Sequence, residues 1–420
     1  METDSLRESS QQDSISLKGK RLLICEEGLL DYKGHFYSWI KAIRAIHLEA
    51  GAEVLVASNL HVDKNIQAEF NAIPTYSRNN WSGIYDHKQA WRRYFSVFAH
   101  NFRVWRETRK LLRKTGPVDC ILLPAVRIHN LMAWRKLCGE RLGRDFGRLV
   151  LFQLTSEAIY DESYTRFHFK RTANLIKFVL RGFRKQVAAG KVILAGDSHI
   201  TCNEYQTLSG VPFRVFPSPV AGLQAANPLS TSASKSDIPT FVILGVSFID
   251  KGIDLLQEAI IQLLKNNPDL EARFVIQWAT PTIDYNGQPV PIKDELRNAA
   301  QVTLIERVLN EEEYRSYLQS AHFVVLPYRR KVYFNRLSGV AVEAACAGIP
   351  MIVTENTWLE WAMKEFGAGV TVRDGDAKDL ADKIKLCIQE RLALQTKALQ
   401  RRNIAMEKNS SIFYLKRVWE

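Results

Sequence analysis

The sequence predicts an α/β protein of two doubly wound domains whose parallel sheets face a central cleft. Two series of short apolar runs alternate with helical patterns, and one stretch poor in large apolar residues separates the two series. A chain of 420 residues is too long for one ordinary core and comfortable as two domains. Because open parallel sheets bind ligands outside the carboxyl ends of their strands, we expect the functional site at the cleft.

The first domain is expected over residues 20–222, after a disordered tail at 1–19. It opens with an apolar strand at 21–25, a glycine-bearing loop, a helix at 36–51 and a second strand at 53–57. This order is that of a βαβ unit. Further buried strands are predicted at 119–123, 149–154 and 191–194.

The second domain is expected over residues 239–400, after a linker at 223–238. The pattern restarts with a strand at 240–244, and a loop containing Lys251 leads into a helix at 253–265. Later strands are predicted at 273–278, 302–305, 323–326, 351–354 and 370–372. The last stretch, 401–420, is predicted to be a helix that packs back toward the N-terminal domain.

Charge narrows the class of partner. Lys and Arg number 57 against 45 Asp and Glu, which gives a net charge of +12. A positive field of this size attracts anions such as nucleotides, nucleic acid or acidic lipid. No RNP, KH, zinc-finger or helix-turn-helix pattern favours nucleic acid, so we expect no nucleic-acid partner.

The cellular compartment is predicted from the cysteine pattern and from the distribution of apolar residues. The six cysteines form no C-x-x-C pair, which indicates free thiols in a reducing compartment rather than a disulfide framework or zinc site. The N-terminal residues contain no apolar stretch typical of a secretory signal. No run reaches the roughly 18 apolar residues that span a bilayer. We therefore expect a cytoplasmic protein, with peripheral attachment to the inner membrane face as a further hypothesis.

The most informative segment is 323–354, FVVLPYRRKVYFNRLSGVAVEAACAGIPMIVT. An apolar strand runs into a basic, aromatic loop, and a helix begins near Ser338 and Gly339. The unpaired amides and dipole of a helix N-terminus attract anions. Positive residues crowd this end: Arg329, Arg330, Lys331 and Arg336. Glu343, one to two turns into the helix, can accept hydrogen bonds from hydroxyls. The pattern predicts a site for the diphosphate and ribose of a nucleotide.

Four segments carry a family resemblance. SGVAVEAACAGIP at 338–350 resembles the donor-binding region of retaining family-4 glycosyltransferases, which have two Rossmann-like domains in the GT-B fold. FVILGVSFIDKGIDLLQEA at 241–259 is similar to the opening of that family's C-terminal domain. VFPSPV before the linker and DYKGHFYSWIKAI near the start resemble two further family segments. The type resembled is that of bacterial exopolysaccharide or lipid-linked glycan synthesis.

The resemblance implies roles residue by residue. It places Lys251 on the donor diphosphate, Glu343 on the ribose hydroxyls, and Asn335 where the family usually has a glutamate that touches the donor sugar. His129 is the candidate for a histidine near the transferred sugar, and Lys251, Asn335 and His129 form the expected catalytic set. The other expected donor-binding residues are Gly34, His35, Gly245, Arg336, Ser338, Gly339 and Val340.

Two departures leave alternatives open. The family's loop arginine is replaced by Val246, and Asn335 replaces a glutamate. Loss of a charge-assisted phosphate contact costs about 1.5–3 kcal/mol unless another group replaces it. Arg336 or Arg329 is the candidate replacement. A non-catalytic nucleotide-sugar-binding subunit of a membrane assembly, or a sugar-nucleotide epimerase, is the alternative function.

A D-x-D pattern at 374–376 has the form that holds a divalent metal in another class of glycosyltransferases. Here it lies between a predicted strand and helix, where Asp376 suits an N-cap. We therefore expect no metal and no cofactor beyond the nucleotide-sugar, which is a substrate. A helix N-terminus with Lys and Arg can neutralise the diphosphate instead.

Two basic, aromatic stretches bear on the acceptor. Residues 88–114 and 166–185 have aromatic and basic residues at helical spacing. For the aromatic side chains we favour a packed core face, whereas the charges suit an anionic membrane surface. The function expected is transfer of a hexose, from a UDP-sugar such as UDP-glucose, to a glycan or lipid-linked acceptor.

Overall fold

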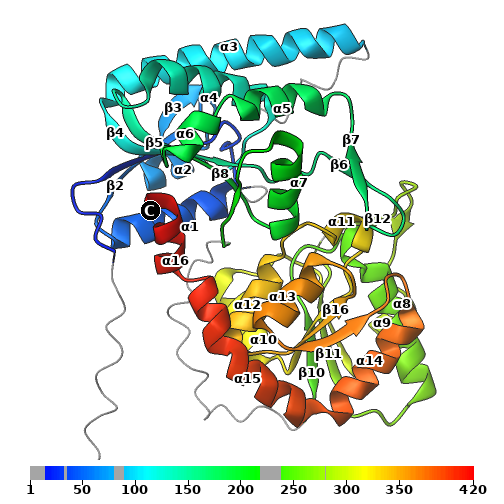
Figure 1. Ribbon diagram of the computed structural model, residues 1–420. Helices are drawn as coiled ribbons and strands as arrows, with labels where there is room; N and C mark the ends of the chain where they lie inside the picture. The colour runs from blue at the N-terminus through cyan, green and yellow to red at the C-terminus, as the bar shows by residue number, and fades with distance from the viewer. Residues whose placement is uncertain (1–14, 33–35, 80–88, 218–237, 280) are drawn as a thin grey trace, which may run out of the picture. The chain divides into compact units, whose positions relative to one another are not determined.

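The computed structural model describes residues 15–32, 36–79, 89–217, 238–279 and 281–420 (Figure 1). It divides into two compact units. The N-terminal unit comprises Met1–Ala221 with Ser411–Glu420, and the C-terminal unit comprises Gly222–Ser410. Each unit holds one parallel sheet with helices around it, which confirms the predicted fold class.

The N-terminal unit is built on a seven-stranded sheet of order β3-β2-β1-β4-β5-β8-β9. Its strands are β1 (Arg21–Cys25), β2 (Glu53–Asn59), β3 (Ile73–Tyr76), β4 (Val118–Leu123), β5 (Phe146–Phe152), β8 (Val192–Gly196) and β9 (Arg214–Val215), and β6 (Ala158–Tyr160) pairs with β7 (Phe167–Phe169) as a separate hairpin. Its helices are α1 (Phe36–Glu49), α2 (Lys64–Phe70), α3 (Ala90–Thr115), α4 (Ile128–Arg141), α5 (Ala173–Arg181), α6 (Arg184–Ala188), α7 (His199–Ser209) and α16 (Ser411–Trp419).

Alternation along β1 explains why both faces of this sheet are covered. Successive side chains of a strand point to opposite faces. Leu22 and Ile24 belong to a core cluster with side chains of α1, α2 and α16. Leu23 and Cys25 belong to a second cluster with side chains of α3, α4, α5 and α7. A strand buried on both sides reads as a continuous apolar run, which is why the sequence pattern revealed it.

The C-terminal unit is built on a six-stranded sheet of order β14-β11-β10-β15-β16-β17. Its strands are β10 (Thr240–Ile243), β11 (Arg273–Gln277), β14 (Val302–Ile305), β15 (Phe323–Leu326), β16 (Met351–Thr354) and β17 (Gly369–Val372), with a small hairpin of β12 (Thr282–Ile283) and β13 (Pro289–Val290). Its helices are η2 (Ile249–Lys251), α8 (Ile253–Asn266), α9 (Asp294–Arg297), α10 (Glu311–Ser320), α11 (Arg330–Tyr333), α12 (Gly339–Ala347), α13 (Trp358–Phe366), α14 (Ala377–Gln389) and α15 (Arg391–Lys408).

Both sheets have a topological switch point. In the N-terminal unit the chain winds outward from β1 through β2 to β3 and then returns to β4 on the other side of β1. In the C-terminal unit it winds from β10 through β11 to β14 and returns to β15. The loops after β1 and β4, and those after β10 and β15, therefore diverge at the carboxyl edge of each sheet, which is the position where doubly wound sheets bind ligands.

Three sequence expectations need correction. The predicted tail at 1–19 extends too far, because Leu17 is buried and its amide donates to the Ala50 carbonyl at 2.7 Å. Residues 166–185 are not one helix, since β7 and α5 divide them and Gly182 ends α5. The stretch 401–420 is also divided: α15 runs to Lys408 in the C-terminal unit, and only α16 belongs to the N-terminal unit.

The favoured core position of the α3 aromatic residues is also wrong. Trp91, Phe95 and Phe102 are 60%, 72% and 58% exposed. The buried face of α3 is formed instead by smaller residues such as Val97, Val104 and Thr108.

All six cysteines are buried free thiols. Among the described helices, none combines the length and apolarity needed to cross a bilayer.

Candidate functional site

The first half of the site is the loop that joins β10 to α8. Gly245 has a φ of +97° and its amide donates to Oε1 of Gln277 at 2.7 Å, at the end of neighbouring β11. Gly252 has a φ of +67°, and a Cβ there would lie 2.1 Å from the carbonyl oxygen of Pro327. Both positions require glycine. The close approach of Gly252 to Pro327 ties this loop to the one that follows β15.

Lys251 places its ammonium group inside this loop. A Cβ on Gly245 would lie 2.8 Å from Nζ of Lys251, and Nζ lies 5.6 Å from the ring centroid of Tyr328. Burial, with the charge of Arg336 as a second cause, lowers the pKa of Lys251 to about 8. Among the described residues no carboxylate pairs with Lys251. A half-buried, unneutralised cation beside a second cation favours an anionic ligand.

The second half is the N-terminus of α12. Ser338 is the N-cap, and its hydroxyl accepts from the Ala341 amide at 3.4 Å. Gly339 and Val340 form the first turn, so their amides are among those that a helix leaves unpaired. A Cβ on Gly245 would meet Cγ2 of Val340 at 4.0 Å. The structure therefore brings together residues from both sides of the switch point.

Arg336 is the arginine associated with this site, and Arg329 is not. Arg336 lies over the ring of Tyr333, with 5.7 Å from Cζ to the centroid, and its charge acts on Lys251. Arg329 instead forms an ion pair with Asp254 at 2.5 Å. Of the two candidates for the loop arginine that Val246 replaces, the geometry favours Arg336. Val246 itself is 38% exposed.

Glu343 is one turn into α12 and half-buried, and burial raises its pKa. Its carboxylate accepts a hydrogen bond from the hydroxyl of Tyr314 on α10. Asn335 is half-buried in the segment between α11 and α12. Asp376 caps α14 by accepting from the Asp379 amide at 2.8 Å, as its position predicts. Within the described residues, no group of three His, Cys, Asp or Glu has the arrangement of a metal site.

A second polar cluster occupies the switch point of the N-terminal unit. Glu27, just after β1, accepts from Nδ2 of Asn130 at 2.8 Å, and its other oxygen lies 2.6 Å from Nε2 of His100. Nδ2 of Asn59, at the end of β2, donates to the Glu27 carbonyl at 3.1 Å. All four side chains are buried. Three elements and the loop after β1 thus contribute to one cluster.

Two further members of this cluster have strongly shifted pKa values. Burial raises the pKa of Glu26 to about 8, and the charge of Glu27 adds to the effect. Burial lowers the pKa of His129 to about 4, with the charges of His100 and Arg127 as further causes. The His129 side chain is 0% exposed. His129 therefore lies close to this buried network, and its expected role near a transferred sugar stays a prediction. Gly34 and His35 lie outside the described residues.

Sequence reasoning missed most of this cluster and several neighbours of Lys251. Glu26 and Glu27 directly follow the first strand, and that position is the signal from which they are predictable. Tyr328 likewise follows β15 by two residues. His100 and Asn130 carry no such signal, because helix positions alone do not show which side chains meet.

Comparison with known proteins identifies the second unit. Residues 238–390 match the family described as glycosyl transferases group 1. The match covers most of the C-terminal unit, and it includes every residue of the Lys251 site. No curated protein matches the chain in sequence.

Solved structures extend the likeness over both units. A glycosyltransferase from Rickettsia africae ESF-5 matches with a TM-score of 0.61 at 12% identity, over 96% of this chain and 99% of that one. HepE of Anabaena in complex with UDP matches with a TM-score of 0.59 at 13% identity, over 94% and 98%. Sucrose-phosphate synthase of Thermosynechococcus elongatus matches with 0.56 at 14% identity, over 95% and 96%. These matches show the GT-B fold.

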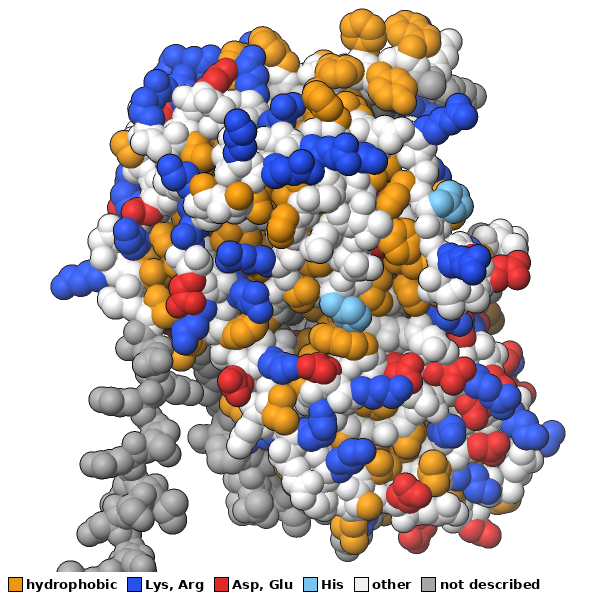
Figure 2. Space-filling view, viewed as in Figure 1, with side chains coloured by type: hydrophobic (Ala, Val, Ile, Leu, Met, Phe, Trp, Pro, Cys, Tyr) orange, Lys and Arg blue, Asp and Glu red, His pale blue; other side chains and the backbone are white. Residues whose placement is uncertain are grey.

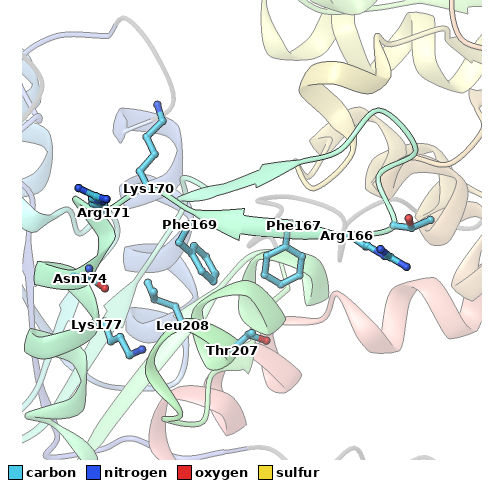
Figure 3. A pocket seen from close by; sticks show the side chains of 10 residues that line it. Arg166, Phe167, Phe169, Lys170, Arg171, Asn174, Lys177, Thr207 and Leu208 are labelled. Carbon is cyan, nitrogen blue, oxygen red and sulfur yellow. The ribbon is translucent and has the colours of Figure 1, made fainter.

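The N-terminal unit offers a pocket of its own. It measures about 720 Å³ and lies against β7, α5 and α7 (Figure 3). Figure 3 shows Phe167 and Phe169 pointing toward Thr207 and Leu208 of α7. Its lining has four positive residues and no acidic one: Arg166, Lys170, Arg171 and Lys177. This pocket favours an anionic ligand that also presents an apolar or sugar surface.

Proposed function

We propose that this protein is a retaining, metal-independent family-4 glycosyltransferase that moves a hexose from a UDP-sugar such as UDP-glucose. The observation that carries the proposal is the Lys251 site within the matched residues 238–390. Half-buried Lys251, nearby Arg336 and the first-turn amides of α12 converge where the sheet order reverses. That combination suits a diphosphate. The structural match to HepE in complex with UDP supports uracil as the base.

In this proposal catalysis consists mainly of positioning and charge neutralisation. As the bond from the sugar to the donor diphosphate breaks, Lys251, Arg336 and the amides of Gly339 and Val340 stabilise the departing charge. The acceptor hydroxyl oxygen forms the new bond to the anomeric carbon that the diphosphate leaves, and a phosphate oxygen of the departing nucleotide takes the proton of that hydroxyl. Glu343 binds the ribose hydroxyls, for which it exchanges the Tyr314 hydrogen bond. Asn335 is the proposed contact to the sugar.

We also propose a phosphate-bearing glycan or lipid-linked glycan as acceptor, in polysaccharide synthesis at the inner face of the cytoplasmic membrane. The basic pocket beside β7 supports an acceptor with negative charge. The net charge of +12 supports the same conclusion, because it raises the local concentration of anions.

Turnover of a panel of UDP- and GDP-sugars in EDTA, with and without membrane extract, tests the function. We expect nucleotide release that extract stimulates. Lys251→Ala should reduce kcat/KM about 10- to 150-fold, because it removes a charge-assisted contact of about 1.5–3 kcal/mol. Glu343→Ala should mainly raise KM. The control is Lys364→Ala, a lysine 68% exposed on α13.

Two outcomes contradict the proposal in different ways. Tight donor binding without nucleotide release under any condition would indicate the non-catalytic subunit, with Val246 and Asn335 as the reason. Conversion of the UDP-sugar to an isomer without an acceptor would indicate the epimerase. If EDTA abolishes the activity and Mg²⁺ or Mn²⁺ restores it, the protein is a transferase that depends on a metal, which contradicts the proposed metal independence.

A further inference from the structure

The N-terminal half of α3 presents an unusual aromatic stripe. Trp91, Phe95, Phe98 and Phe102 follow the spacing i, i+4, i+7, i+11 and lie on one face of the helix. They are 60%, 72%, 49% and 58% exposed, and Tyr94 beside them is 47% exposed. Figure 2 shows hydrophobic side chains gathered over this helix. Single exposed aromatics need no explanation, but a contiguous patch marks an interaction site.

The aromatic stripe is not the face by which α3 packs into the core, because a different face of α3 packs against α4. Asn101 donates through Nδ2 to the Ile128 carbonyl at 2.9 Å, and its Oδ1 accepts from the Ala133 amide at 2.9 Å. These bonds join α3 to α4. Val104 and Thr108, on the same side as Asn101, are 1% and 0% exposed. The aromatic stripe is therefore held outward by a helix that is already packed.

Positive charge borders the stripe closely. Residues 90–115 contain eight Lys or Arg and one acid. That acid, Glu107, is bound to the Ser77 hydroxyl at 2.6 Å. The guanidinium of Arg92 lies 5.3 Å from the ring centroid of Trp91, and that of Arg109 lies 4.7 Å from the centroid of Trp105. A cation thus lies beside the ring at the N-terminal end of the stripe, and Arg109, which also pairs with Glu140 at 3.9 Å, lies beside the half-buried ring just beyond its other end.

This combination selects one occupant. Aromatic rings settle at the boundary of headgroups and acyl chains, and Lys or Arg beside them attract anionic headgroups. A second copy of the chain fits poorly, because two equally basic faces would repel each other.

We propose that the α3 stripe, Trp91, Tyr94, Phe95, Phe98 and Phe102 with the basic residues beside it, binds the surface of an anionic lipid bilayer. The inference deepens the proposed function, on which it rests for a lipid-linked acceptor. Binding there would keep the enzyme at the surface that displays such an acceptor.

Flotation of the full chain with phosphatidylcholine vesicles, with and without 30% phosphatidylglycerol, tests the surface. We expect flotation only with the anionic vesicles, weakened by high salt. The triple variant Trp91→Ser, Phe95→Ser, Phe102→Ser should lower the bound fraction at least about tenfold, because binding scales with buried apolar area. The triple variant Arg92→Gln, Arg106→Gln, Lys110→Gln should lose the preference for phosphatidylglycerol.

A matched control separates this face from general hydrophobicity. Val308→Ser with Leu392→Ser removes side chains that are 71% and 72% exposed in the C-terminal unit, and should leave flotation unchanged. Equal flotation of wild type and the aromatic variant would overturn the proposal. The proposal would also be overturned if light scattering showed a dimeric wild type and a monomeric aromatic variant, and neither protein bound vesicles. That outcome would make the stripe a subunit interface.

UDP-glucose turnover by the same variants without vesicles distinguishes the two proposals. Turnover unchanged in the aromatic variant, with flotation lost, supports both. Flotation without turnover of any donor would support membrane binding by α3 and contradict the transferase proposal. Turnover without flotation would support the transferase proposal and contradict membrane binding.

Discussion

Glu26 is a buried carboxyl of the N-terminal unit with a strongly raised pKa. Its carboxyl is 1% exposed, accepts from the Gly28 amide at 2.8 Å, and has Oε2 without a partner among the described residues. Burial and Glu27 raise its pKa to about 8. A carboxyl with this environment is protonated at neutral pH in the folded chain and ionised in the unfolded chain.

Glu26→Gln is therefore expected to flatten the pH dependence of stability. Between the unfolded pKa of about 4.5 and about 8, the folded state binds more protons, so the free energy of unfolding falls as pH rises. This loss of stability is absent below the unfolded pKa and complete above the folded pKa. Glutamine keeps the acceptor oxygen without the charge. The variant should match wild type at pH 4.5 and exceed it by roughly 2–5 kcal/mol at pH 9.

Urea unfolding of both proteins across this pH range measures the effect. Glu53→Gln is the control, since that glutamate is 54% exposed in an ion pair with Arg21 and should show no such gain. Parallel curves for wild type and Glu26→Gln at every pH would show that Glu26 is ionised in the folded chain.

At the scale of elements, the contact between the loops after β10 and β15 shapes the donor site. Gly252 ends η2 in the left-handed region, with φ of +67°, and lies against the carbonyl of Pro327. Gly287, in the β12–β13 turn, has a comparable φ of +81° but no atom within 4 Å of a Cβ. The two glycines thus share a left-handed backbone conformation and differ in contact.

Gly252→Ala should destabilise the C-terminal unit by roughly 2–4 kcal/mol, since it combines left-handed strain with a clash against backbone. It should also weaken UDP binding, because relief of the clash moves Lys251 away from α12. Gly287→Ala should cost about 1 kcal/mol and leave UDP binding intact. Calorimetry with titration of UDP measures both. Equal effects of the two substitutions would show that the loop contact is unimportant.

At the scale of the whole molecule, the C-terminal segment Ser411–Glu420 belongs to the N-terminal unit. Tyr414, Leu415 and Val418 of α16 are buried in the core cluster that contains Leu22 and Ile40. Arg148 on β5 donates to the carbonyl of Val418 at 2.8 Å. The N-terminal unit therefore needs the last ten residues of the chain to complete its core.

Leu415→Ala is expected to lower the stability of the N-terminal unit by about 2–4 kcal/mol through the cavity it leaves. Leu399→Ala, at a site 53% exposed on α15, is the control and should change stability by less than about 0.5 kcal/mol. UDP is proposed to bind the C-terminal unit. Added UDP should therefore raise the midpoint temperature of only that unit's unfolding transition, which Leu415→Ala does not shift. A single transition lowered equally by both substitutions would contradict this division.

Much of the fold and part of the site were predictable because the information is local. Runs such as RLLIC and FVVL identify strands buried on both faces. Positive-φ glycines and caps, including Gly252, Ser338 and Asp376, set the loops and helix starts at the carboxyl edge. From these the sequence by itself determined two parallel α/β domains and the neighbourhood of Lys251 and α12.

Only the tertiary structure decided which side chains meet. It pairs Arg329 with Asp254, which leaves Arg336 for the Lys251 site. It joins Glu27 to His100 and Asn130, 73 and 103 residues away along the chain. It also turns the α3 stripe outward, since helical periodicity shows that a face is apolar without showing what covers it. Such pairings depend on how whole elements pack, and no local pattern specifies them.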